Sequence, residues 1–174
     1  GTAVGTFFTG SQFVVDKAAV ADIGSPVISR WANAWHGLEA VANPFNVEFG
    51  LMVMFLAVAL GALYTINNID EDALAKQLRR ALAYSFVAFL VMFVLVMLQL
   101  LTMDGFAVDA SGMVYMEEYK YLHNLIAMPH TLVMILMGAV LLVVGVAATL
   151  FKRDFKRGIW LAAPGTVLAV MALF

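Results

Sequence analysis

The sequence has 174 residues, of which 63% are hydrophobic and only 13% charged, and its mean hydropathy is +0.92. Soluble domains are roughly half apolar and about a quarter charged, so this composition excludes an ordinary water-soluble protein. The net charge of −2 offers nothing to a phosphate backbone, so nucleic acid is not an expected partner, and the lack of cysteine excludes disulfides, thiolate zinc sites and iron–sulfur clusters.

The N-terminal segment, residues 1–46, is expected to lie outside the membrane. It opens without a start methionine, a basic n-region or a signal-cleavage motif, which indicates a chain cut from something longer. Within it, Ser25–Ala42 starts with a capping serine and a proline, and its apolar residues recur at helical spacing. With Trp31 and Trp35, this stretch is predicted to form an amphipathic helix that lies flat at the membrane interface. Packing of the same face on other subunits is the alternative.

Residues 47–174 are predicted to form a transmembrane bundle from four apolar runs. About 20 apolar residues cross a hydrocarbon core of about 30 Å, and the first three runs reach that length. The last run has 17 residues, roughly 25 Å as a helix, and is expected to continue beyond the chain. The predicted fold class is all-α: a polytopic bundle of about four membrane helices plus a short interfacial helix. The four runs are Asn46–Ile66, Ala81–Met103, Leu125–Phe151 and Gly158–Phe174.

Basic residues in the short loops predict the orientation of the bundle. Loop 67–80 contains Lys76, Arg79 and Arg80, and loop 152–157 contains four lysines and arginines. The loop between them, residues 104–124, has four acidic residues and a single lysine. Loops 67–80 and 152–157 are therefore predicted to be cytoplasmic.

Small residues recur on single faces of three of the predicted helices. Such faces let helix backbones approach closely, so they predict helix packing. The residues are Ala57 and Gly61 in the first run, Ala81, Ser85 and Ala88 in the second, and Gly138, Gly145 and Ala148 in the third.

The three histidines do not form an obvious haem site. A haem between helices needs a histidine from each of two facing helices, and only His130 lies within a predicted span. His123 lies seven residues earlier, on the same face, so the two cannot hold one iron from opposite sides. We expect His130 to be satisfied by Asn124 or by a neighbouring helix. A small b-type cytochrome that uses His36 and His130 is an alternative.

Glu48 is a carboxyl group just inside the first predicted span. A charge at that depth costs a few kcal/mol unless it is paired, neutral or reached by water, so Glu48 is a candidate for a proton path. A carboxylate near a helix start is also stabilised by the helix dipole and by headgroup water, and we favour this interpretation. No nucleotide-binding loop, metal triad or nucleophile–base motif occurs in the sequence.

Five short motifs follow one another along the chain. They are GTAVGTFFTGSQF at 1–13, NPF at 43–45, GALYTI at 61–66, RRA at 79–81 and MDGFAV at 103–108. Their order resembles subunit II of cytochrome bd-type ubiquinol oxidases over most of the chain, which would then correspond to the second half of that subunit. The resemblance carries over structural positions only: Asn43, Pro44 and Phe45 at the start of a helix, and Asp104 and Gly105 at an outer turn.

This resemblance implies a membrane subunit that has no active site and binds no haem itself. It would lie in the bacterial cytoplasmic membrane and stabilise a haem-bearing subunit I by packing against it. Haem b and haem d are expected in that partner, and quinol would be the substrate of the complex, which reduces dioxygen. The resemblance also allows a bound quinone, and membrane lipid would surround the helices.

A membrane transporter or channel half is the alternative function. In that case Glu48 and His130 would line a polar path. A helix interrupted near the middle of the membrane would favour this function, and Pro164 in the last run is the one candidate for such an interruption.

Overall fold

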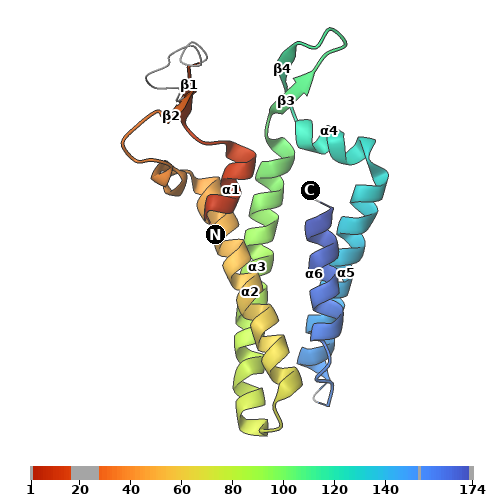
Figure 1. The fold of residues 1–174 in the computed structure, drawn as a ribbon. Coiled ribbons are helices and arrows are strands. Elements are labelled where there is room, and N and C mark those ends of the chain that lie inside the picture. Colours follow the sequence, from red (N-terminus) through yellow and green to blue (C-terminus); the bar gives the residue numbers. More distant parts are fainter. Residues whose placement is uncertain (1, 17–27, 153, 173–174) are drawn as a thin grey trace. The chain divides into compact units, whose positions relative to one another are not determined.

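The computed structural model contains the helices that the apolar runs predict (Figure 1). Three of them are long and apolar enough to cross a membrane, namely α2 (Pro44–Asn68), α3 (Asp72–Thr102) and α5 (Pro129–Phe151). A shorter apolar helix, α6 (Ile159–Met171), follows. This confirms the predicted all-α membrane bundle. The structure describes residues 2–16, 28–152 and 154–172, and by its contacts the chain divides into two units, Gly1–Leu51 and Met52–Phe174.

The first unit joins short elements to the beginning of α2. Helix α1 packs near a 3-10 helix, and two short strands form an antiparallel pair in which Phe13 lies opposite Trp31. The elements before α2 are α1 (Thr2–Thr9), β1 (Phe13–Val15), β2 (Ser29–Trp31) and the 3-10 helix η2 (Leu38–Ala42).

The amphipathic helix predicted over Ser25–Ala42 is not continuous in the structure. Residues 25–27 of it lie outside the described residues, and β2 occupies residues 29–31. His36 and Gly37 have φ angles of 50° and 94°, a left-handed backbone conformation that cannot continue a right-handed helix. Helical turns in the described part of this segment are therefore confined to η2. The apolar side chains of the predicted face, among them Trp35 and Leu38, are nevertheless exposed on the surface of this segment.

The second unit has one hydrophobic cluster to which four helices contribute. Leu63 and Ile66 come from α2, Leu82 from α3, Val146 from α5 and Ala162 from α6, and each is at most 1% exposed. Phe86 and Phe89 stack on each other on the same face of α3, with ring centroids 5.8 Å apart. The last turns of α2 therefore pack with α3, α5 and α6.

Glycines set the close packing of α5 on α6, which lie side by side in Figure 1. A Cβ atom added at Gly138 would lie 2.5 Å from the carbonyl oxygen of Gly165, and one added at Gly145 would lie 2.6 Å from that of Gly158. The two backbones are thus in direct contact, as the small-residue face of the third run predicts. The face predicted on α2 differs, because Ala57 and Gly61 are exposed within the described chain.

Two boundaries differ from the sequence-based prediction. The loop predicted over Asn67–Arg80 is only a short turn, because α2 continues to Asn68 and α3 begins at Asp72, so that its basic residues lie on the first turns of α3. The helix predicted over Leu125–Phe151 is divided into α4 (Lys120–Ala127) and α5. Met128 separates them with φ −117° and ψ 74°, because a residue before proline avoids the helical conformation.

An antiparallel hairpin, which the sequence did not predict, follows α3. Its strands are β3 (Gly105–Val108) and β4 (Val114–Glu117). At its turn, the carboxylate of Asp109 accepts hydrogen bonds from the backbone N–H groups of Ser111 and Met113, at 2.8 and 2.9 Å, and from the Ser111 hydroxyl. These bonds, led by the Ser111 side chain, hold the pKa of Asp109 below its ordinary value. The hairpin therefore has an ordered turn outside the apolar spans.

Candidate functional site

The start of α2 is built by the Asn-Pro-Phe motif. The side-chain oxygen of Asn43 accepts a hydrogen bond of 3.0 Å from the N–H of Phe45, which is the arrangement of a helix N-cap. Pro44 occupies the first helical position, where its missing N–H costs nothing. The ring of Phe45 is buried against Phe8 and Phe49, at centroid distances of 6.0 and 6.1 Å. These three residues hold the helix start in place by capping and packing.

Asn46, one residue further on, is the most buried polar side chain among the described residues of the first unit, at 1% exposed. Its oxygen accepts a hydrogen bond from the Thr9 hydroxyl at 3.0 Å, and its amide donates to the carbonyl of Ala40 at 3.1 Å. A Cβ atom at Gly5 would collide with this side chain, so α1 needs a glycine there. From the sequence, Asn46 was predicted only to be the first residue of a span. Its hydrogen bonds were not predicted, because they join it to other segments of the chain.

The two residues proposed for a polar path lie near helix starts. Glu48 is half-buried in the second turn of α2 and takes part in an interaction within the chain. His130 is exposed in the first turn of α5. Helix α6 runs through Pro164 without an interruption, so the feature that would favour a transporter is absent from the described part of α6.

A cluster of charged side chains ties the hairpin to α4. The two oxygens of Glu117 contact Lys120 Nζ and His123 Nδ1, each at 2.7 Å. First the Lys120 hydrogen bond and then the His123 hydrogen bond lower the pKa of Glu117 from its ordinary value. Gly105 is buried against Lys120, because a Cβ atom there would lie 2.8 Å from the Lys120 Cβ, whereas Asp104 is exposed.

The three histidines do not belong to a cluster of metal ligands among the described residues. No group of three or more His, Asp or Glu side chains suited to a metal ion occurs among them. His123 is engaged by Glu117, and His36 is exposed in a left-handed turn of the first unit. His130, the remaining histidine, is exposed at the start of α5.

The two basic segments meet at one end of the second unit. Lys156 donates a hydrogen bond of 2.8 Å to the carbonyl of Ile69 and lies 3.5 Å from the carboxylate of Asp70. Arg79 donates to the carbonyl of Lys152 at 3.5 Å. The turn after α2 and the connection between α5 and α6 thus lie together, as two loops on one side of a membrane would.

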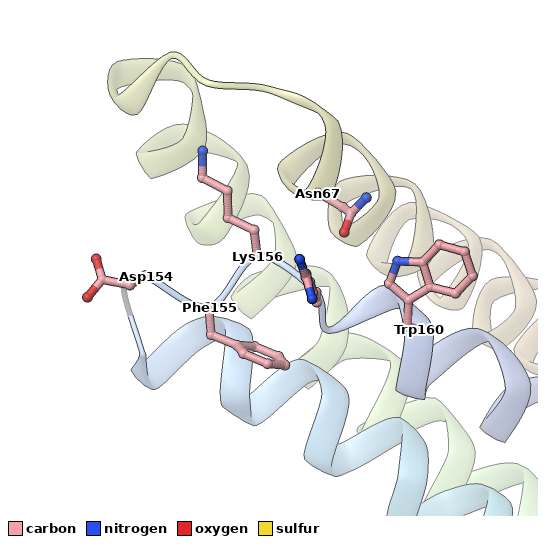
Figure 2. Close-up of a pocket in the computed structure, with 6 residues that line it drawn as sticks. Asn67, Asp154, Phe155, Lys156 and Trp160 are labelled. Carbon is pink, nitrogen blue, oxygen red and sulfur yellow. The ribbon is translucent and has the colours of Figure 1, made fainter.

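A hollow of about 1120 Å³ opens at this basic end (Figure 2). It is lined by the loop after α5, by Asn67 at the end of α2 and by Trp160 at the start of α6. The indole of Trp160 is 71% exposed. Sequence reasoning did not identify this place, because it forms only where the ends of three helices come together, although a tryptophan beside a basic loop is a known signal of the membrane interface.

Most of the apolar helix surface is not covered by this chain. Only 33%, 28% and 22% of the most apolar windows of α2, α3 and α5 are buried. On α3 the exposed side chains form a stripe with helical spacing, made up of Tyr84, Val87, Val91, Val94 and Leu98. Lipid or other protein segments must cover these faces, because water would not be tolerated over so large an apolar area.

The fold and the uncovered apolar helices define a multi-pass membrane protein. The family model for cytochrome bd terminal oxidase subunit II matches residues 1–174, and the chain belongs to this family. Membership makes it a membrane subunit of a respiratory oxidase that contains haems and at least one further subunit. No curated protein and no solved structure matches the sequence.

Proposed function

We propose that this chain is a non-haem-binding subunit of a quinol:O2 oxidoreductase, which packs against the haem-bearing subunit I and stabilises it. Haem b and haem d would lie in that partner, which would oxidise quinol and reduce dioxygen. The observation that carries the proposal is the large uncovered apolar surface of three long helices in a chain of this family. A subunit that acts by packing needs such a surface.

The α3 stripe is the best candidate for the contact with the partner. Its residues stand on one face of a helix of 31 residues, about 46 Å long, which exceeds the hydrocarbon core of about 30 Å. The stripe itself, from Tyr84 to Leu98, rises by about 21 Å and so offers apolar contact over about two thirds of that depth. Because apolar side chains gain little by leaving lipid for another apolar surface, close fit rather than hydrophobicity would select the partner.

We also propose that the protein lies in the bacterial cytoplasmic membrane, with residues 67–80 and 152–157 on the cytoplasmic side. The contacts between these basic segments support a common side, and the positive-inside rule assigns that side to the cytoplasm. The hairpin, at the other end of α3, would then be outside.

Affinity purification combined with photocrosslinking tests the proposal. An affinity tag on the complete protein should bring down a second subunit together with the absorption bands of haem b and haem d. A photoreactive amino acid at Val91 of the α3 stripe should crosslink to that subunit, whereas the same amino acid at Leu82, which is fully buried, should crosslink only within its own chain. Purification of the tagged protein without haem and without a second subunit would contradict the proposal.

A further inference from the structure

The hollow at the basic end continues into an apolar groove between the end of α2 and α6. This groove has a volume of about 740 Å³ and shares Asn67 and Trp160 with the hollow. Its other lining residues are mostly apolar and include Tyr64, Ile159, Ala163, Val167, Leu168 and Met171. The combined hollow thus has a polar mouth at the loops and an apolar floor along the apolar helix α6.

The depth of the groove fits one leaflet of a bilayer. From Trp160 to Met171, α6 rises by about 17 Å, and half of a hydrocarbon core of about 30 Å is about 15 Å. Trp160 at the mouth belongs to the residue type that is enriched at the depth of lipid headgroups. An acyl chain that entered at Trp160 would therefore reach the middle of the membrane near Met171.

The mouth carries the charge that a phosphate group requires. Arg157 is exposed there. Lys156 also lines the mouth, but its ammonium group donates to the carbonyl of Ile69 and lies 3.5 Å from the carboxylate of Asp70, so Arg157 is the cation proposed to meet a ligand. A guanidinium group binds phosphate through two parallel hydrogen bonds, which makes arginine the preferred partner of a phosphodiester at an interface. Asp154 is the one carboxylate among the described lining residues of the mouth, and Figure 2 shows it at the opposite end from Trp160.

We propose that this groove binds an anionic glycerophospholipid, with its phosphate at Arg157 and one acyl chain along α6. A neutral ligand would have no use for the exposed guanidinium group of Arg157 at the mouth, and a protein helix would leave the hollow of about 1120 Å³ unfilled. The proposal rests on the membrane-spanning helices and not on the contact with a haem-bearing subunit. Its failure is therefore distinguishable from that of the proposed function, which the haem bands report.

The test measures which phospholipids stay bound. The complete protein with its partner subunits is placed in nanodiscs of equal parts phosphatidylglycerol and phosphatidylcholine, extracted in mild detergent and examined by native mass spectrometry. Arg157→Gln removes the cationic group at the mouth, and Arg80→Gln is the matched control, since Arg80 is exposed on α3 and does not line the groove. Ala163→Phe fills the groove without a change in charge, and Val170→Phe is its control on an exposed position of α6.

We expect the wild type and both controls to retain phosphatidylglycerol in preference to phosphatidylcholine. Arg157→Gln should reduce that preference about tenfold, equivalent to about 1.4 kcal/mol, and Ala163→Phe should reduce retention of both lipids. Melting temperatures in detergent check that each variant is folded, and Ala163→Leu replaces the phenylalanine variant if that one is not. Absence of bound lipid from the wild type would overturn the proposal, and it is the result expected if another protein helix fills the groove. So would equal retention by each variant and its control.

Discussion

Replacing Gly145 with alanine tests whether backbone contact holds α5 against α6. The added Cβ atom would lie 2.6 Å from the carbonyl oxygen of Gly158 and 2.9 Å from the backbone nitrogen of Ala162. The first distance is roughly 0.8 Å short of the ordinary contact of 3.4 Å. Both neighbouring atoms belong to the backbone, so they cannot rotate away as the end of a side chain could. The helices would have to separate along this face.

The expected cost follows from two opposing effects. Overpacking of a tight interface costs about 1–3 kcal/mol, whereas replacing a mid-helix glycine with alanine gains about 0.5–1 kcal/mol of helix stability. Gly145→Ala should therefore lower the free energy of unfolding by about 1 kcal/mol, and at most by about 2.5 kcal/mol. Gly61→Ala is the matched control, because nothing lies within 4 Å of the Cβ atom that it adds. Gly61→Ala should therefore show only the gain in helix stability of about 0.5–1 kcal/mol.

Unfolding of the protein in mixed micelles by titration with sodium dodecyl sulfate, followed by circular dichroism, measures both variants. The difference between them isolates the cost of overpacking, since the change in backbone flexibility is common to both. If Gly145→Ala proves as stable as Gly61→Ala, the close contact of α5 and α6 is not what holds this pair together, and the packing argument fails.

Two further variants test the helix start and the hairpin. Asn43→Ala removes the acceptor for the Phe45 N–H and should destabilise the first turn of α2 by about 0.5–2 kcal/mol, seen as faster amide exchange there, while Asn43→Ser should restore most of the protection. Glu117→Gln should loosen the link between β4 and α4. Because Lys120, and then His123, lower the pKa of Glu117 in the folded state, this carboxylate stabilises the hairpin fully at pH values above its ordinary pKa of 4.5 and loses that effect as the pH falls below it. The protection factors of the β4 amides, which correct for the pH dependence of the chemical exchange rate, should thus fall below about pH 4.5 in the wild type but not in the glutamine variant, and an equal acid response in both would rule out this role for the carboxylate.

The membrane helices were predictable because each apolar run can form all its backbone hydrogen bonds within a single helix. A helix closes its hydrogen bonds within itself, so composition and length alone indicate where it lies in a bilayer. The Asn-Pro-Phe start of α2 was readable for a similar reason, since a cap and its helix are adjacent in the chain. The proline after Met128 also indicated a helix boundary there. The prediction missed this boundary because the apolar run continues across it without a break.

The remaining features depend on residues that are distant in sequence. The face of Ala57 and Gly61 looks the same in the sequence as that of Gly138 and Gly145, yet only the second meets another helix within the described chain. Likewise, the sequence showed the basic residues of loop 152–157, but it did not predict the contact of Lys156 with the carbonyl of Ile69.

The sequence by itself thus determined that this is a membrane protein, where its long helices lie and which family it resembles, because apolar length and local motifs are properties of neighbouring residues. Only the tertiary structure decided which small faces are in contact, that Glu117 joins the hairpin to α4, and that Asn67 and Trp160 border one groove. Those features arise where separate helices meet, and lipid, unlike water, exerts no general hydrophobic force that would reveal from composition which faces come together.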